Sequence, residues 1–349
     1  MLFNDSIMPK ISRKKETYPI SGDLHHYLQD HQRLTKVPIT YQDLLRYDNT
    51  VPLYDKLNQD TLWVTVFYPQ NDMDWIYYAL KMIYSLLKAD GDVSVMEHLY
   101  VDRVDLCIYG NTRPFRVRIV NRINDNFDYF YIKNADASRI YGLELEHILS
   151  PNRISYLVAD QTLIEEHIAG IPGDRFFQDQ LHNGHQNLTR LAKEFVKFNE
   201  RCFVRLLGDM HANNFVVDVT PDFDELHYRI RAIDFDQQSY EGRKSIYMPQ
   251  YFKQNNPIIQ VGLKLMTPES VRQYQTEEHA LIATRMRSAR YQVQDLMQAM
   301  TKDTLAPPAH VVQLKRDLAE HYRSTQFEAS RSMGDLVRAS LQEALHPGI

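Results

Sequence analysis

Hydrophobic and polar positions alternate along the first half of the chain in a pattern that predicts both strands and helices. β-branched and aromatic residues fill positions 61–68, which predicts a strand, and apolar residues recur at helical spacing over 71–90. Between about 103 and 133, apolar runs are broken at Gly110-Asn111 and at 124–126. These breaks predict a three-stranded antiparallel meander.

The pattern then changes from mostly β to mostly α. A helical stretch over 136–149 is followed by two short strands around 154–160 and 162–168. A loop rich in glycine and proline comes next, and beyond it helical patterns dominate, including one long amphipathic pattern over 269–300. One predicted hairpin over 214–235 interrupts them. We therefore expect an α+β protein with a bilobal plan.

This order of elements also suggests domain boundaries. We expect an N-terminal extension over residues 1–94, a β-rich N-lobe over 95–168 and a helical C-lobe over 169–349. The extension either extends the sheet of the N-lobe through its predicted strand or docks on the back of that lobe. Its first 20 residues are polar and unperiodic, which predicts a loose arm.

Charge and cysteine usage exclude several classes of function. The formal net charge is −5 at pH 7, so no global basic field favours nucleic acid as a partner. No apolar window approaches the roughly 18 residues of a spanning helix, and the N-terminus lacks a secretory segment. We therefore expect no membrane partner and a cytoplasmic location. Cys107 and Cys202 lie in apolar runs and are expected to be reduced core residues.

The strongest chemical signal is a polar cluster within two apolar runs, LLGDMHANNFVVD and IRAIDFD. Asp209 and Asn214 are five positions apart in the first run, and Asp234 ends the strand of the second. Pairing of the two runs as a hairpin would bring the three side chains to one end of the ribbon. An Asn and an Asp supply oxygen ligands of the kind that Mg²⁺ shares with phosphates. Asp209 would then be free to accept a proton from an attacking hydroxyl.

GDMHANNF followed by IDFD resembles the catalytic loop and metal loop of the protein-kinase-like fold, in its aminoglycoside-phosphotransferase branch. The resemblance covers roughly residues 95–300 and extends to the order of the motifs. It implies that Asp209 is the catalytic base and that Asn214 and Asp234 bind Mg²⁺. His211 matches the loop histidine of this branch, which has a supporting role.

The resemblance also implies an ATP site in the N-lobe. Lys133 falls where the family has its phosphate-binding lysine, at the end of the third strand of the meander. Its partner would be an acid on the following helix, for which Glu144 is the first choice and Glu146 the second. The backbone of a hinge would bind adenine, and its residues are Glu166, His167 and Ile168.

The sequence departs from the family pattern at four places, one of which is the insertion TPDFDE, which lengthens the stretch between the two aspartates. Leu207 stands where the family has a histidine, and the turn YGNTRPF offers one glycine where protein kinases have a glycine-rich loop. Asp236 replaces the glycine that follows the metal-binding Asp-Phe pair of protein kinases. It is either a further acid near a second metal ion or a helix cap.

The motifs together predict an ATP- and Mg²⁺-dependent phosphotransferase that moves the γ-phosphate to a hydroxyl group. A small-molecule acceptor is favoured over a protein substrate because the resemblance points to it. Three alternatives stay open: a pseudokinase-type nucleotide-binding or interaction module, nucleotidyl transfer on the same fold, and an unrelated helical protein in which these acids cap turns.

Overall fold

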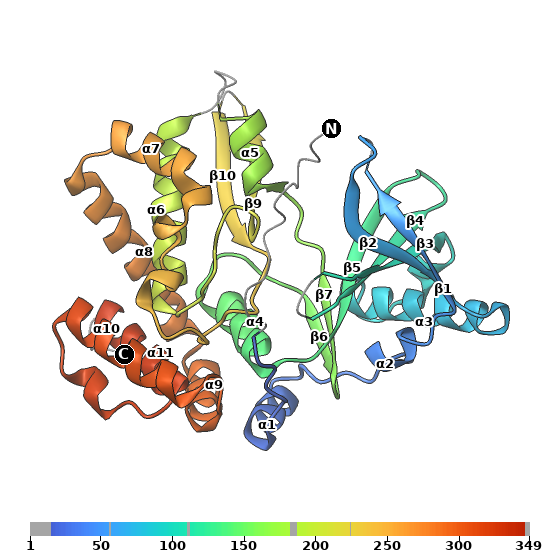
Figure 1. Cartoon of the computed structure of the whole chain (residues 1–349), viewed down its shortest axis with the longest axis horizontal. Coiled ribbons are helices and arrows are strands. Elements are labelled where there is room, and N and C mark those ends of the chain that lie inside the picture. Colours follow the sequence, from blue (N-terminus) through green and yellow to red (C-terminus); the bar gives the residue numbers. More distant parts are fainter. Residues whose placement is uncertain (1–14, 56, 110–111, 182–186, 224, 346–349) are drawn as a thin grey trace, which may run out of the picture.

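The chain folds into a β-rich part and a helical part, as Figure 1 shows. This computed structural model describes residues 15–55, 57–109, 112–181, 187–223 and 225–345. The predicted α+β class with a β-rich N-terminal part and a helical C-terminal part is confirmed. The predicted turn at Gly110-Asn111 lies outside the described residues.

One antiparallel sheet of seven strands forms the β-rich part. Its strands, in spatial order, are β1 (Asn49–Tyr54), β2 (Asp60–Phe67), β3 (Leu99–Cys107), β4 (Phe115–Asn121), β5 (Phe127–Asn134), β7 (Thr162–Glu166) and β6 (Tyr156–Ala159). The predicted meander is β3-β4-β5, and the two predicted strands after the helix are β6 and β7. Because β7 inserts between β5 and β6, the hinge strand lies directly beside the strand that carries Lys133.

A helix covers one face of this sheet. The buried positions of α3 (Gln70–Lys88) recur at helical spacing, and they form a core with Phe130 and Ile132 of β5. Side chains alternate along a strand, so Tyr131 and Lys133 project from the opposite face. The sheet therefore presents polar side chains on the side away from α3. Two shorter helices complete this part: α2 (Tyr41–Leu44) and the 3₁₀ turn η1 (Val93–Met96).

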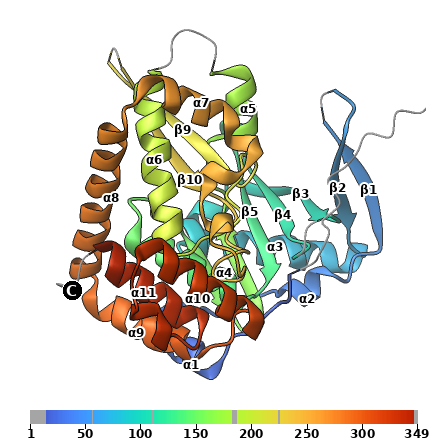
Figure 2. The ribbon, with the colours of Figure 1, turned by 60° about the vertical axis from the view of Figure 1, so that its left-hand side comes forward.

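The helix between β5 and β6, α4 (Ala137–Leu149), belongs to the core of the helical part. Twelve of its 13 residues are buried, and its apolar side chains share one cluster with those of α1 (Gly22–Asp30) and the C-terminal helices. A helix that is apolar on all sides must be covered on all sides. In Figure 2 the C-terminal helices lie in front of α4, with α1 beside α9 below it. α4 is thus fixed within the structure.

A small sheet and the helices from α5 onward complete the helical part. The sheet has the order β10 (Glu225–Ala232), β9 (Phe215–Asp222), β8 (Ile171–Pro172). The helices are α5 (Gly173–Asp179), α6 (Leu188–Val204), α7 (Asn256–Leu265), α8 (Pro268–Ser288), α9 (Arg290–Lys302), α10 (Pro308–Tyr322) and α11 (Met333–Leu345). Short 3₁₀ turns are η2 (Lys244–Tyr247), η3 (Pro249–Tyr251), η4 (Lys253–Asn255) and η5 (Gln326–Ala329).

Two elements differ from the expectation. β1 was not expected because it is an edge strand with mostly exposed residues and a proline, Pro52, so it shows no hydrophobic alternation. The single pattern expected over 269–300 is two helices, which meet at Ala289. Periodicity alone does not reveal such a corner, because the apolar spacing continues across it. The predicted boundaries after residues 94 and 168 stay predictions.

The N-terminal segment is better ordered than expected. The amide of Ala137 donates a hydrogen bond of 2.8 Å to the carbonyl of Tyr18, and Lys15 forms an ion pair with Asp136. Tyr18 and Ile20 also pack against the main core. The expectation of a loose arm is therefore wrong for residues 15–20, because their aromatic and apolar side chains find partners at the start of α4. Residues 1–14 lie outside the described part.

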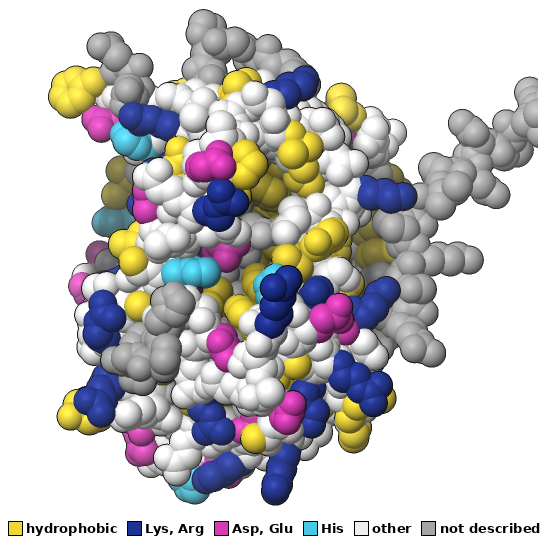
Figure 3. Space-filling model, turned by 90° about the vertical axis from the view of Figure 1, so that its left-hand side faces the viewer, with side chains coloured by type: hydrophobic (Ala, Val, Ile, Leu, Met, Phe, Trp, Pro, Cys, Tyr) yellow, Lys and Arg dark blue, Asp and Glu magenta, His cyan; other side chains and the backbone are white. Residues whose placement is uncertain are grey.

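The charges on the surface, the helices and the cysteines can be compared with what the composition led us to expect. Basic and acidic side chains are interspersed over the face shown in Figure 3. None of the helices described here combines the length and the apolar run needed to cross a bilayer. Cys202 is buried as expected, whereas Cys107 is half-buried, and neither forms a disulfide.

Candidate active site

The loop that carries Asp209 is held by backbone hydrogen bonds to segments that follow the metal loop. The amide of Gly208 donates to the carbonyl of Gln237 (3.1 Å), and that of Asp209 donates to Ile246 (3.0 Å). Asp209 has a positive φ of 61°, a conformation that Asp adopts more readily than most residues. Leu207, which stands where the family has a histidine, is fully buried and occupies a position in the core. The loop directs the Asp209 carboxylate away from this core.

The two carboxylates and the one amide of the motif, Asp209, Asp234 and Asn214, lie together at one end of the β9–β10 hairpin. Hairpin pairing joins Phe215 to Ala232, and the next residue, Ile233, donates its amide to the carbonyl of Asn214 (3.0 Å). The side-chain amide nitrogen of Asn214 donates to the backbone carbonyl of Asp209 (2.8 Å). Asn214 therefore connects the loop of Asp209 to the end of the strand that precedes Asp234.

Burial and nearby carboxylates change the acidity of Asp209. Desolvation, followed by the negative charges of Asp234 and Glu241, raises the pKa of Asp209 to about 7. Its side chain still keeps 41% of its accessible surface, so a substrate can reach it. A carboxylate with this pKa can both hold and release a proton near neutral pH, which suits a general base.

The raised pKa of Asp209 predicts a pH-dependent stability. The folded pKa of about 7 exceeds the ordinary value of 3.8, so the native state retains a proton that the unfolded state releases. The stability contribution therefore falls as pH rises from about 4 to about 7. We expect Asp209→Asn, which cannot ionise, to gain Tm relative to the wild type across this window. Thermal unfolding at constant ionic strength measures the difference, and a gap that does not change with pH would contradict the assignment.

Asp234 and Asn214 form a small oxygen donor set. The side chain of Asp234 is 38% accessible, and the amide nitrogen of Asn214 is already bonded, which leaves the amide oxygen for a ligand. Within the described ranges, no group of three or more His, Cys, Asp or Glu residues could hold a metal ion. Mg²⁺ commonly uses one or two protein oxygens and completes its shell with water and phosphate. The donor set fits this ion together with a nucleotide.

Lys133 pairs with an acid on the neighbouring strand. Its ammonium nitrogen lies 2.9 Å from Oε2 of Glu165. In the register of β5 and β7, Glu165 is opposite Tyr131, two positions from Lys133, so both side chains project from the same face. Burial opposes the charge on Glu165, but Arg139 and Lys133 outweigh it and lower the pKa of Glu165 to about 2. The alternation of side chains along the predicted strand TLIEEHI was the sequence signal that could have identified Glu165.

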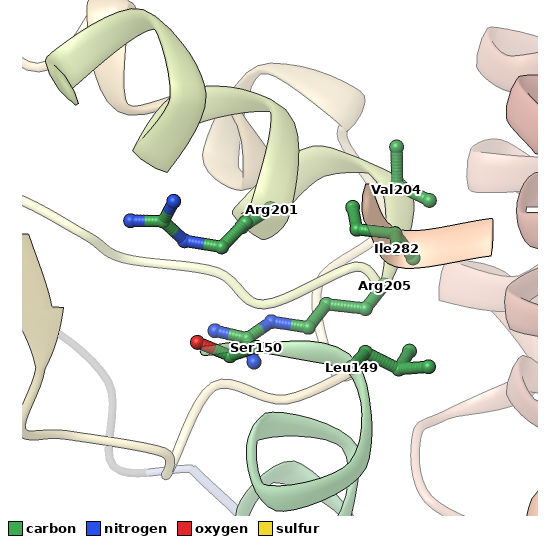
Figure 4. A pocket seen from close by; sticks show the side chains of 6 residues that line it. All are labelled: Leu149, Ser150, Arg201, Val204, Arg205 and Ile282. Atoms are coloured by element: carbon green, nitrogen blue, oxygen red, sulfur yellow. The ribbon is translucent and has the colours of Figure 1, made fainter. Parts of the chain in front are cut away.

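The predicted pairing of Lys133 with Glu144 or Glu146 is wrong. Glu144 is fully buried and forms an ion pair with Arg33 (2.8 Å), while Glu146 forms one with Arg205 at the end of α6. Figure 4 shows Arg205 extending toward the end of α4 beside a small cavity. Both glutamates face the helical core because α4 is buried in it. Their role is to connect α4 to its neighbours.

Sequence reasoning missed Arg139, which lies in the first turn of α4. This fully buried guanidinium donates to both oxygens of Glu165, to Asp234 (2.6 Å) and to Asp236 (2.7 Å). Burial opposes its charge, but the carboxylates raise the pKa of Arg139 well above its ordinary value. A lone arginine in an apolar helix gives no sequence signal for partners so distant along the chain.

The predicted hinge begins at Glu166, the last residue of β7, and two of its amides already donate hydrogen bonds. The amide of Glu166 donates to Ser155 (3.1 Å), and that of His167 donates to Tyr129 (3.3 Å). The ring of His167 also meets the hydroxyl of Tyr131 (3.2 Å). Of the three hinge amides, that of Ile168 donates no backbone hydrogen bond to any described residue, so it is left for a ligand.

His211 lies next to Asp209 within the loop. Its amide donates to the carbonyl of Asp209 (2.9 Å), and its Nδ1 accepts from the amide of Asn213 (3.3 Å). Burial lowers the pKa of His211, so the ring is neutral at physiological pH. These bonds shape the loop, which agrees with a supporting role for this residue.

Comparisons with known proteins add little to this geometry. No family model matches the chain, and no curated protein matches it. Among solved structures it is similar to the autoinhibited serine kinase domain of the giant muscle protein titin, with 10% identity, a TM-score of 0.26, and coverage of 70% of this chain and 93% of that one. A structure of titin kinase and its flanking domains gives 10% identity, a TM-score of 0.24, and coverage of 80% and 64%. Similarity at this level carries no argument about activity.

The description of the fold therefore rests on the topology of the chain itself. The sheet order β3-β4-β5-β7-β6, with α4 between β5 and β6, precedes a hairpin that bears the polar motif. The predicted aminoglycoside-phosphotransferase branch stays a prediction.

Proposed function

We propose that this protein is an ATP- and Mg²⁺-dependent phosphotransferase that acts on a hydroxyl group of a small molecule. The observation that carries the proposal is the position of Asp209. Its carboxylate has a pKa of about 7 and lies beside Asn214 and Asp234 at the end of one hairpin. A base with this acidity, next to oxygen ligands for a divalent ion, is what phosphoryl transfer to an alcohol requires.

The residues would divide the reaction among them. Asp209 orients the acceptor hydroxyl and takes its proton as the oxygen attacks the γ-phosphorus and the bond to the nucleoside diphosphate breaks. Asn214 and Asp234 would hold Mg²⁺, which when bound neutralises charge on the phosphate oxygens. Lys133, which projects from the polar face of the sheet, binds the phosphates. The amide of Ile168 is the candidate donor for adenine.

An open cleft lies between the sheet and α5. A cavity of about 760 Å³ is lined by Tyr54 in β1, by Arg116 and Tyr129 on the polar face of the sheet, and by Arg175 and Gln178 of α5. This volume is of the size that small ligands occupy, and its lining mixes aromatic and polar groups. None of Asp209, Asn214, Asp234 and Lys133 lines this cavity, so the preference for a small-molecule acceptor rests on the resemblance of the motifs. A location in the cytoplasm, without nucleic-acid or membrane partners, is part of the proposal.

A pseudokinase-type binding module is the second candidate, and one observation favours it. The carboxylate most needed for the metal is already in an ion pair, because Asp234 contacts Arg139. Nucleotide binding without any turnover that depends on Asp209 would support the module. Transfer of the α-phosphate label instead of the γ-phosphate label would support nucleotidyl transfer.

Metal-dependent nucleotide binding tests the proposal directly. We expect Asn214→Ala and Asp234→Ala each to weaken Mg²⁺-dependent ATP binding by about 10–100-fold, because each removes an oxygen ligand. Thermal shift titrations with ATP, with and without Mg²⁺, measure the effect. Asn213→Ala and Asp222→Ala are matched controls, since both side chains are exposed and neither is in the donor set. Unchanged binding in both test variants would refute the metal assignment.

A further inference from the structure

The metal loop contains a second carboxylate whose partner is a cation of the protein. Nη1 of Arg139 lies 2.6 Å from Oδ1 of Asp234 and 2.7 Å from Oδ1 of Asp236. One nitrogen therefore bridges two acids that are two positions apart in the chain. The amide of Asp236 also donates to Oδ1 of Asp234 (3.1 Å), so this oxygen is fully engaged.

The position of this guanidinium is set by the fold. Its other nitrogens donate to the two oxygens of Glu165 on β7. Its helix, α4, is buried along nearly its whole length, and the N-cap of that helix, Asp136, is held by Lys15. Arg139 therefore cannot leave the metal loop without disturbing both a core helix and the N-terminal segment.

The local charge balance explains what this arrangement achieves. Asp234, Asp236 and Glu165 supply three negative charges, and Arg139 and Lys133 supply two positive charges. Two buried carboxylates side by side repel each other unless a cation lies between them. A divalent ion is one solution, and a guanidinium is another because its planar fork donates to several oxygens at once. The structure has the second solution between Asp234 and Asp236.

We propose that Arg139 takes the place of a second divalent cation at the metal loop, so that the site binds a single Mg²⁺. This inference rests on the proposed function and specifies its metal requirement. The accessible part of Asp234, 38% of its side chain, is left for that ion, whereas Asp236 is only 15% accessible and is neutralised by Arg139. Arg139 is a positioning residue: it holds the carboxylates and does not touch the substrate.

Manganese binding followed by electron paramagnetic resonance tests the inference without measuring activity. With Mn²⁺ alone, the wild type should bind no second ion at the metal loop, because Arg139 already neutralises Asp236. Arg139→Gln should gain a site, with at least about tenfold higher affinity for Mn²⁺, because the paired carboxylates need a new cation. The double variant Arg139→Gln/Asp236→Asn should lose that site again. If Arg139→Gln binds Mn²⁺ no better than the wild type, or if the wild type binds a second ion that Asp236→Asn abolishes, the inference is overturned.

A second measurement covers the case in which Arg139→Gln does not fold. The wild-type protein with a non-hydrolysable ATP analogue should bind one Mn²⁺ per nucleotide, and two ions per nucleotide would overturn the inference. The two proposals fail separately. If the wild type binds no nucleotide, the proposed phosphotransferase function is refuted. The titration with Mn²⁺ alone would still decide the role of Arg139.

Discussion

We expect Asp209→Asn to lower kcat for phosphoryl transfer by about 10²–10⁴-fold while Mg²⁺-dependent ATP binding persists. The reason is that the amide cannot accept the proton of the acceptor hydroxyl, although it is nearly isosteric with the carboxylate. The backbone bonds that hold this loop, from Gly208 and Asp209 to later segments, do not involve the side chain and should survive. Initial rates of γ-phosphate transfer and thermal shift with ATP measure the two properties.

The control for this variant is Asp222→Asn, because Asp222 is an exposed acid at the far end of the same hairpin. It should keep the wild-type rate. Wild-type turnover by Asp209→Asn would remove the proposed base from the reaction. A pH profile of kcat/KM adds an independent check, since activity should rise through about pH 7 as Asp209 loses its proton.

We expect Glu144→Gln to destabilise the fold by about 3–5 kcal/mol, because it leaves buried partners without their counter-charge. The carboxylate accepts hydrogen bonds from the hydroxyls of Tyr27 and Tyr156 and forms an ion pair with Arg33. It joins α1, α4 and β6, so its loss weakens the contact of three elements. Chemical denaturation of the full chain gives the change in the free energy of unfolding.

This variant also distinguishes the role that the sequence predicted for Glu144 from the role that Glu144 has in the structure. If Glu144 were the partner of Lys133, its loss would weaken ATP binding; as a residue of the core, it should leave the ATP affinity of folded protein unchanged. Glu269→Gln is the matched control, because the Glu269 side chain is 75% accessible and its stability effect should stay within about 0.5 kcal/mol. A loss of stability no larger than that of the control would contradict the assignment of Glu144 to the core.

Local patterns in the sequence were enough for the elements and for the centre of the site. The meander, the hairpin and most helices follow from apolar periodicity, which depends only on neighbours along the chain. Asp209 and Asn214 are close in sequence, and the hairpin that brings Asp234 to them is a local pairing. These residues could therefore be placed together before any tertiary contact was known.

Only the tertiary structure decided how the charges of the site are paired. Lys133 meets Glu165 across 32 positions, and Arg139 meets Asp234 across 95. Periodicity shows which side of an element is buried, but it does not show which other element lies against that side. In α4, Glu144 and Glu146 face the helical core and Arg139 faces the metal loop. The packing of whole helices sets this orientation.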